Sequence, residues 1–207
     1  MSKLTTPDEI RALYGHPKGR SVTKQLDRLE THSRRFIELS PFLVIATSRP
    51  GDEGGGLADA SPKGDMPGFV QVLDDHTIAI PDRPGNNRLD SMENLLVNPA
   101  VGLIFFIPGV NETLRINGFA EIRDDTELLA RFEVNGKLPK TVYVVTVKEA
   151  YLHCAKALVR SKLWSAEAQA PERPIPNMSR MINEQTNGDA PEETDAEMLA
   201  RYRKVLY

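Results

Sequence analysis

The chain has 207 residues, of which 40% are hydrophobic and 27% charged, and its formal net charge is −3. These values predict a folded globular protein of one domain, with or without terminal extensions. A negative net charge argues against nucleic acid as the main partner, because nucleic-acid-binding domains usually carry a basic patch or stripe. The single cysteine, Cys154, excludes an internal disulfide and suits a reducing cytoplasm.

Membrane and metal binding are also disfavoured. The longest apolar run, from Ala100 to Pro108, is too short to span a bilayer, and the N-terminus lacks the apolar core of a signal peptide. The four histidines are scattered without the spacing of metal ligands. We therefore expect a cytoplasmic protein that uses neither a membrane nor a structural metal.

The N-terminal part of the chain predicts two helices. Thr6 is expected to cap the first, with Pro7 at the first helical position and Glu9 completing a capping box. A longer helix is expected from about Val22 to Leu39, where apolar residues approximate a helical stripe. Pro41 ends it, and the sequence then becomes strand-like.

Short apolar or alternating runs bounded by turn residues predict strands in the middle of the chain. They are Phe42–Thr47, Leu57–Ser61, Phe69–Leu73, Thr77–Ile80, Val101–Ile107, Thr113–Ile122 and Thr141–Tyr151. Helices are expected at Asn87–Leu96, Thr126–Phe132, Cys154–Trp164 and Ala196–Val205, and a flexible turn at Gly51–Gly56. Because so few helices separate the strands, a mainly β fold, an antiparallel Greek-key barrel of about six strands, is favoured over a doubly wound parallel sheet.

These elements divide the chain into three parts. We expect an N-terminal helical extension at 1–40, a β-barrel domain with peripheral helices at 41–165, and a C-terminal extension with a terminal helix at 166–207. The stretch Ala166–Asp195 is polar and rich in proline, which is the composition of a linker.

The run Val101–Ile107 is apolar at every position. One face of an antiparallel sheet usually meets water, so a strand without polar positions needs cover on both sides. Two interpretations stay open: a helix covers the second face, or that face meets another subunit. In the second case a charged residue in place of Phe105 or Ile107 is expected to dissociate a dimer.

The stretch from Asp59 to Arg88 holds the residues best suited to bind an anion. Ser61 and Lys63 lie in its first cluster, where Pro62 and Gly64 fix the backbone around the lysine. A lysine on such a rigid base is suited to face a ligand, although a plain polar turn is the alternative.

A second cluster runs from Arg83 to Arg88. Gly85, Asn86 and Asn87 readily adopt left-handed conformations, so successive amides can form a concave nest for an anion. The cluster leads into the helix expected at Asn87, whose free amides and dipole favour an anion as well; a helix cap with two solvated arginines is the alternative. Three charge-assisted hydrogen bonds, at roughly 1.5–3 kcal/mol each, approach the roughly 8 kcal/mol of a micromolar complex. Together the clusters predict a cofactor phosphate site.

Two further residues are ambiguous from sequence alone. Because side chains alternate along a strand, Arg115 faces the opposite way from Leu114 and Ile116. It could face a ligand or simply be exposed to solvent. Trp164 follows three polar residues on an expected helix and is suited to packing or to stacking on a ring. His153 and Cys154 make a weak nucleophilic pair, because neighbouring residues on a strand face opposite ways.

Taken together, the motifs SPKGD, IPDRPGNNR, IPG…ETLRINGFAEI and CAKALVRSKLW resemble those of the pyridoxamine 5′-phosphate oxidase-like flavoproteins, from about Phe42 to Trp164. The resemblance implies a split barrel that binds flavin mononucleotide (FMN), as a homodimer with the cofactors at the subunit interface. Position by position it implies cofactor contacts from Asp59, Ala60, Ser61, Lys63, Ile80, Pro81, Asp82, Asn87, Arg88, Arg115 and Trp164. Asn87 and Arg88 would grip the phosphate with help from Lys63, and Arg115 would approach from the partner subunit.

The resemblance also implies an FMN-dependent oxidoreductase that acts on a small molecule, with the flavin supplying the redox chemistry. The chain ends in Arg201–Tyr207 and lacks the C-terminal arginine and histidine motif with which the vitamin B6 oxidases grip substrate, so oxidation of pyridoxamine phosphate is not expected. The alternatives are a non-catalytic flavin-binding sensor or carrier, a deazaflavin-dependent reductase, and, least favoured for want of a ligand histidine, a haem-handling barrel.

Overall fold

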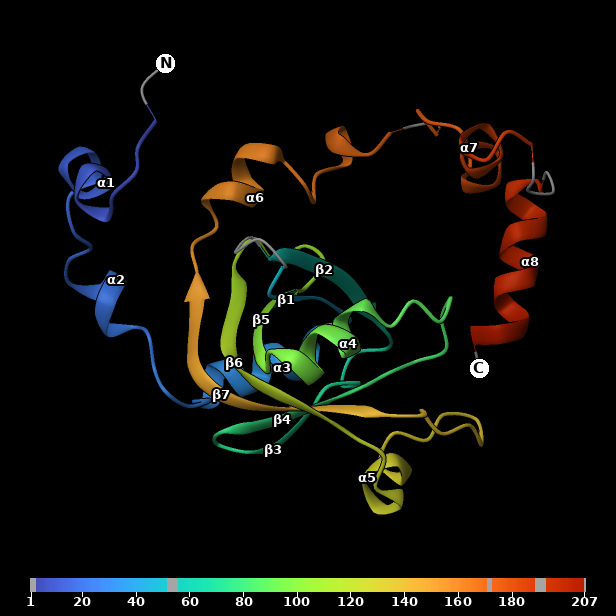
Figure 1. Cartoon of the computed structure of the whole chain (residues 1–207), viewed down its shortest axis with the longest axis horizontal. Coiled ribbons are helices and arrows are strands. Elements are labelled where there is room, and N and C mark those ends of the chain that lie inside the picture. Colours follow the sequence, from blue (N-terminus) through green and yellow to red (C-terminus); the bar gives the residue numbers. More distant parts are fainter. Residues whose placement is uncertain (1–2, 52–55, 171–172, 189–192, 207) are drawn as a thin grey trace.

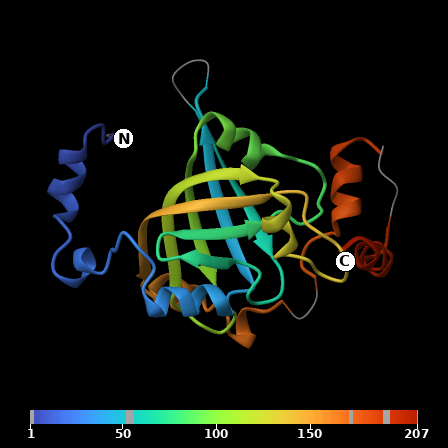
Figure 2. The same ribbon diagram turned by 90° about the horizontal axis from the view of Figure 1, so that it is seen from below.

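The computed structural model describes residues 3–51, 56–170, 173–188 and 193–206. Its body is one antiparallel sheet with the strand order β2-β1-β5-β6-β7-β4-β3, strongly curved around the core (Figure 1, Figure 2). The strands are β1 Phe42–Arg49, β2 Leu57–Gly64, β3 Gln71–Asp74, β4 Thr77–Pro81, β5 Ala100–Phe106, β6 Thr113–Arg123 and β7 Val142–His153.

The mainly β, antiparallel class predicted from the sequence is confirmed, but the predicted barrel of six strands is wrong in its count. The sheet has seven strands, and the edge strands β2 and β3 are not neighbours in it, so the ladder is not closed. Each of the seven strand runs predicted from the sequence overlaps one of these strands, including the short β3, which forms a hairpin with β4. Only the total of about six strands was too low.

Helices lie at the ends of the sheet and beyond it. They are α1 Pro7–Tyr14, α2 Arg20–Thr23, α3 Thr31–Leu39, α4 Asp90–Val97, α5 Thr126–Ala130, α6 Lys156–Ser161, the 3₁₀ turn η1 Ala166–Ala168, α7 Met178–Gln185 and α8 Asp195–Leu206. No helix among the described residues is both long enough and apolar enough to cross a membrane.

Alternation along the strands builds the core. The inner face of the sheet carries Ile45, Phe105 and Ile116, each 0% exposed, together with α3 residues such as Ile37. Burying each such side chain contributes about 1.5–3 kcal/mol. Because Leu29 and α3 join this core, the compact body begins upstream of β1, whereas α1 and α2 bury no residue.

The N-terminal expectations are met only in part. The capping box is present: the Thr6 hydroxyl accepts from the Glu9 amide, and the Glu9 carboxylate accepts from the Thr6 amide at 2.9 Å. The single helix expected from Val22 to Leu39 is wrong. Leu26 forms a β-bridge with Ala150 instead, and the resulting extended segment separates α2 from α3.

The C-terminal part is helical where expected at its end, where α8 covers the predicted Ala196–Val205. The tail before it also contains η1 and α7, which its linker-like composition did not predict. Helix α6 is shorter than expected and ends before Lys162, which has a left-handed φ of 53°. The predicted turn at Gly51–Gly56 falls largely on residues 52–55, outside the described part of the chain.

Strand β5 alternates despite its uniformly apolar sequence. Val101, Leu103 and Phe105 are buried, while Gly102, Ile104 and Phe106 remain partly exposed on the outer face of the sheet. Phe105 is therefore a core residue, and Ile107 packs against the core as well, so a charge at either position would disturb the core rather than a dimer interface. The outward-facing residues of this strand are Ile104 and Phe106.

Candidate functional site

The first cluster, on β2, contacts two residues that flank the second cluster, Asp82 and Ser91. Lys63 lies on β2 and Asp82 directly follows β4, and the Lys63 ammonium lies 2.7 Å from the Asp82 carboxylate. Their side chains are only 20% and 21% exposed. The buried Tyr143 of β7 completes the group, since its hydroxyl lies 3.4 Å from Lys63 Nζ and 3.5 Å from Asp82 Oδ1.

Burial raises the pKa of the Tyr143 hydroxyl well above its ordinary value, and the neighbouring Asp82 carboxylate raises the pKa further. The phenol therefore keeps its proton at neutral pH and can donate to Asp82. Lys63 also lies over the Tyr143 ring, with its ammonium 5.0 Å from the ring centroid, as in a cation–π contact.

A second set of contacts joins β2 to α4. The Ser91 hydroxyl, at the start of α4, lies 3.1 Å from the Ser61 hydroxyl and donates to Asp59 Oδ2 at 3.2 Å. Ser61 also donates to Asp59, at 3.3 Å. The contacts place hydroxyls and one carboxylate of β2 beside the loop that precedes α4.

Of the three loop residues expected to be left-handed, Gly85, Asn86 and Asn87, only Asn87 is, and the helix starts later than predicted. Asn87 is left-handed, with φ 59°, and the Arg88 amide donates to Asn86 Oδ1 at 3.0 Å. Helix α4 begins at Asp90 with Leu89 as N-cap, so the N-cap predicted at Asn87 is wrong. The positive φ at Asn87 turns the chain before the helix can begin, because αL geometry cannot continue into a right-handed helix.

Arg88 is the accessible cation of this loop. Its guanidinium is 75% exposed and pairs with Asp90 at 2.9 Å. The hydrogen bond to Asp90, its charge and the charge of Asp59 raise the pKa of Arg88, so the arginine is positively charged at any physiological pH.

Arg83, the other arginine of the loop, turns away from the site. Its Nε donates to Asp65 at 2.7 Å and its Nη1 to the Phe132 carbonyl at 2.7 Å, and the Asp65 side chain is only 5% exposed. This arginine fastens the loop to the body.

The other predicted contacts are placed as follows. Ile80 and Pro81 are buried in β4, so only their backbone can meet a ligand there. Ala60 is exposed at the edge strand β2. Arg115 and Trp164 do not join Lys63: Arg115 stands half-buried on the outer face of β6, and the Trp164 indole donates to the Val110 carbonyl at 2.8 Å.

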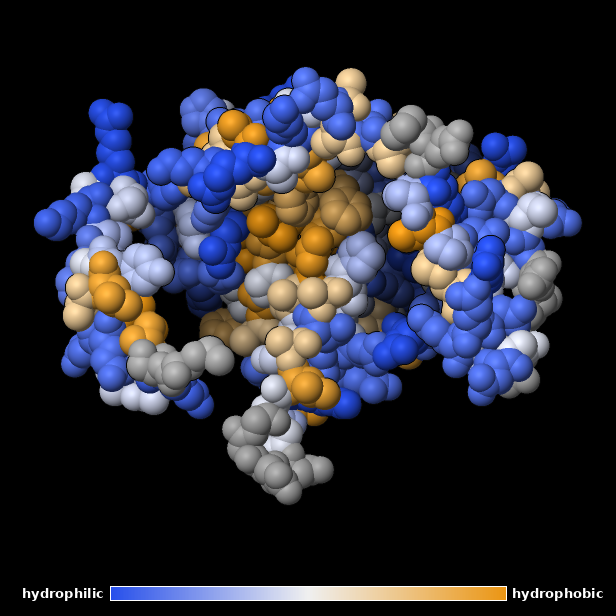
Figure 3. Space-filling model, turned by 90° about the horizontal axis from the view of Figure 1, so that it is seen from above, coloured by the Kyte–Doolittle hydropathy of each residue, from blue (hydrophilic) through white to orange (hydrophobic). Residues whose placement is uncertain are grey.

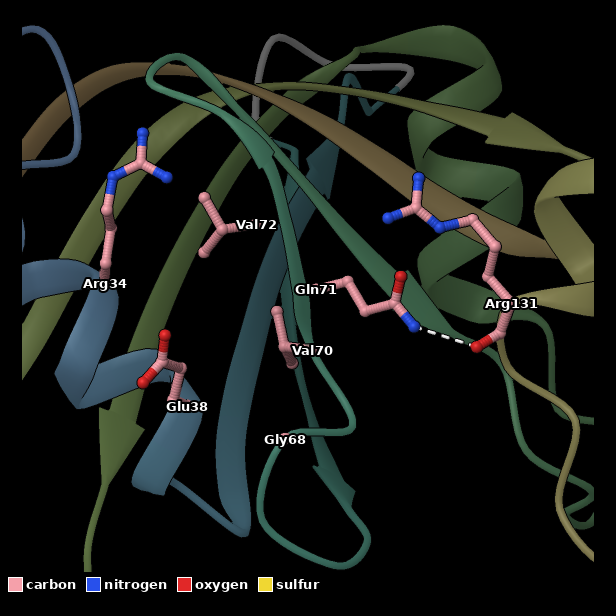
Figure 4. A pocket seen from close by; sticks show the side chains of 7 residues that line it. All are labelled: Arg34, Glu38, Gly68, Val70, Gln71, Val72 and Arg131. Carbon is pink, nitrogen blue, oxygen red and sulfur yellow. Dashed lines mark hydrogen bonds between the residues drawn. The ribbon is translucent and has the colours of Figure 1, made fainter.

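A separate hollow of about 310 Å³ lies between α3 and β3, and none of the sequence-predicted residues lines it (Figure 4). Arg34 and Arg131 stand on either side of β3 there, and Gln71 donates across the floor to the Arg131 carbonyl at 2.8 Å. Arg34 is held by Asp75. We place the functional site at β2 and α4, because that is where hydroxyl, amide and cationic donors converge.

Two residues of the site were not found from the sequence. Tyr143 occupies a buried position in the alternating run Thr141–Tyr151, and its polar hydroxyl in an otherwise apolar strand was an available signal. Ser91 carried no signal of its own, since only the packing of α4 across β2 brings it to Ser61. Within the described ranges, no group of three or more histidine, cysteine or acidic side chains could hold a metal.

Together these observations describe an antiparallel β protein with a rim of hydroxyl and cationic side chains between the edge strand β2 and the start of α4. The family model described as pyridoxamine 5′-phosphate oxidase matches residues 29–154, which is more than half of the chain. The chain therefore belongs to the pyridoxamine 5′-phosphate oxidase family. No curated protein matched it.

Several solved structures are similar at low sequence identity. HupZ of Group A Streptococcus is 16% identical, with a TM-score of 0.47, over 60% of this chain and 93% of that one. A candidate pyridoxamine 5′-phosphate oxidase of Lactobacillus delbrueckii is 18% identical, with a TM-score of 0.46, over 62% and 98%. An FMN-binding protein of Syntrophomonas wolfei is 10% identical, with a TM-score of 0.41, over 71% and 96%. These values carry no argument about function.

Proposed function

We propose that this protein binds FMN and serves as an FMN-dependent oxidoreductase for a small-molecule substrate. The observation that carries the proposal is the convergence of β2 with the segment between β4 and α4, joined by the Lys63–Asp82 ion pair at 2.7 Å and the Ser91–Ser61 contact at 3.1 Å. Membership of the family supports a flavin as the ligand.

The donor set fits a phosphate at the Arg88 end of the rim. Exposed ion pairs such as Arg88–Asp90 contribute little to stability, so a phosphate can displace Asp90 at little cost. The left-handed conformation of Asn87, next to this arginine, is one in which neighbouring backbone amides can turn toward an anion. Lys63 is less free, because Asp82 neutralises it in a half-buried pair. We therefore assign the phosphate chiefly to Arg88 and the turn amides, and Lys63 to a supporting role.

When bound, the flavin would supply the hydride or electron transfer. The protein would bind and orient it: Asp59, Ser61 and Ser91 offer one acceptor and two hydroxyls along β2. Asp82 and Tyr143 hold the Lys63 ammonium in a fixed position at the inner end of the rim, where its N–H groups can donate to the cofactor.

A homodimer is part of the proposal. The outer face of the sheet carries an apolar half, formed on β2, β1 and β5 by Pro62, Phe42, Val44, Ala46, Ile104 and Phe106. Figure 3 shows an apolar, hollowed surface between the two terminal arms on this side of the molecule. An exposed apolar patch of this kind typically marks an interface. A second copy on it would also bring Arg115, which borders the apolar half, toward the partner's cofactor.

One observation favours a second candidate function, a flavin-binding carrier or sensor without its own substrate. Lys63, Asp82 and Tyr143 form hydrogen bonds with one another. Each group of the described site that could act as a general acid or base therefore already has a hydrogen-bond partner. A carrier needs a bound flavin but no such group.

Purification followed by mass identification of the released cofactor tests the proposal. We expect a yellow protein that releases FMN. A preparation that stays colourless after addition of FMN would overturn flavin binding, and release of a deazaflavin would correct the cofactor. Turnover with a panel of reductants then separates the enzyme from the carrier.

A further inference from the structure

Two cations share one aromatic ring on the outer face of the sheet. Arg115 of β6 lies over the Tyr151 ring of β7, with its guanidinium carbon 5.4 Å from the ring centroid. Lys24, from the N-terminal segment, lies over the same ring with its ammonium 5.6 Å from the centroid. Arg115 pairs with Tyr151 across β6 and β7, and the bridge of Leu26 to Ala150 brings the N-terminal segment along the other edge of β7 (Figure 1). Two cations from different parts of the chain therefore lie over the same ring.

Neither cation is neutralised by a carboxylate in the part of the chain that the structure describes. Lys24 donates only to the Leu152 carbonyl, at 2.9 Å, and Arg115 makes no ion pair there. The carboxylate on the same face of β7 is Glu149, which already accepts from Asn117 at 2.7 Å and from Gln25 at 2.8 Å. Two like charges beside one ring repel each other, and an anion that binds between them relieves the repulsion.

The surroundings suit a small organic anion. The register places Arg115 next to Ile104 on β5, so the cations adjoin the apolar half of the outer face. The Tyr151 hydroxyl adds a neutral donor at the ring's end. Arginine and lysine bind carboxylate and phosphate oxygens through charge-assisted hydrogen bonds, and the apolar border can meet a hydrocarbon or ring.

We infer that Lys24, Arg115 and Tyr151 form a binding site for the carboxylate or phosphate group of a small molecule. The site gives the N-terminal segment a role, because the bridge at Leu26 is what places Lys24 over the ring. It does not depend on a bound flavin. If two copies pair through the apolar half, the site lies beside that interface, where an anionic substrate group could be held near the partner's cofactor.

The test follows backbone amide signals of Leu26 and Tyr151 by NMR while the full-length protein is titrated with inorganic phosphate and, separately, with benzoate. We expect saturable shifts with a dissociation constant on the order of millimolar for at least one of these anions. Lys24→Gln and Arg115→Gln should each weaken binding about tenfold, the loss of one charge-assisted hydrogen bond. Tyr151→Phe should weaken it less, because the ring and both charges remain.

Lys148→Gln is the matched control, since Lys148 lies 5.9 Å from the centre of one ring, Phe119, without a second cation over that ring. It should leave anion binding unchanged. The inference fails if neither anion gives saturable shifts, or if Lys148→Gln weakens binding as much as Lys24→Gln. It also fails if Lys24→Gln lowers only the melting temperature, which is what a purely packing role predicts. Failure here leaves flavin content untouched, so the two proposals are separable.

Discussion

At the residue scale, the two arginines of one loop have different roles that composition alone could not assign. Arg83 is tied to Asp65 and to the Phe132 carbonyl, whereas Arg88 stands 75% exposed beside Asp90. In the sequence the two residues are similar cations, five positions apart. Only the fold shows that one fastens the loop and the other presents its charge.

Arg83→Ala should therefore lower the free energy of unfolding but leave flavin binding unchanged. Breaking a buried ion pair costs about 3–5 kcal/mol, because the buried Asp65 carboxylate loses its positively charged partner. Urea unfolding of the variant checks the loss, and the flavin bound per folded molecule should stay at the wild-type level. The Arg83→Gln, Asp65→Asn double variant should recover part of the stability. Wild-type stability combined with lost flavin would contradict the assignment.

Glu30 makes a pH-dependent contribution to stability. Burial of its carboxylate tends to raise the pKa, but the backbone amides of His32 and Ser33 and the Ser33 hydroxyl outweigh it, so the pKa lies below the ordinary 4.5. A carboxylate with a lowered folded-state pKa stabilises the fold above its unfolded pKa and loses that effect as the pH falls through the folded value. Glu30→Gln should cost about 0.5–1 kcal/mol at neutral pH.

The cost should shrink as the pH falls through the lowered folded-state pKa of Glu30, and vanish where the carboxyl is protonated in both states. Urea unfolding of both proteins at neutral pH and across the acidic range checks it. A difference in stability that persists undiminished in acid would mean that the carboxylate charge is not what caps α3.

At the element scale, the alternation of apolar and polar residues could be read from the sequence, but the pairing of segments far apart in the chain could not. Every predicted strand run overlaps a strand, because the apolar pattern reports the buried face directly. The helix predicted from Val22 to Leu39 fails because Leu26 instead pairs with Ala150, far away in the sequence. The left-handed conformation of Asn87 was predicted, but the contacts of Tyr143 and Ser91 depend on which strands become neighbours. The motifs of the candidate site could thus be predicted from the sequence, but the contacts that their residues make with the rest of the chain could not.

The register shift between β6 and β7, where Lys148 of β7 is the unpaired residue, gives an element-scale prediction. A Cβ on Gly118 would lie 2.0 Å from the Thr146 carbonyl oxygen, in the irregular pairing between β6 and β7. Gly118→Ala should destabilise the protein by about 1–3 kcal/mol, because the two backbones cannot separate without breaking the ladder. Gly85→Ala is the control, since nothing lies within 4 Å of its Cβ position. Thermal unfolding showing equal midpoints for the two variants would refute the steric argument.

At the scale of the whole molecule, the apolar half of the outer face should hold two copies together. Phe106→Glu places a charge there and should halve the mass measured by light scattering. Phe119→Glu is the matched control, because Phe119 is 50% exposed on β6 outside the apolar half. A wild-type protein of monomer mass, or a Phe106→Glu variant that keeps the dimer mass, would show that this face is not the interface.

The central claim is that Arg88 and the turn before α4 hold the phosphate of a flavin. Titration of the cofactor-free protein with FMN and with riboflavin, which lacks the phosphate, tests it most directly. Arg88→Ala should weaken FMN binding about tenfold or more, the value of a charge-assisted hydrogen bond, and leave riboflavin binding unchanged. Equal losses for both ligands, or an unchanged affinity for FMN, would contradict the account.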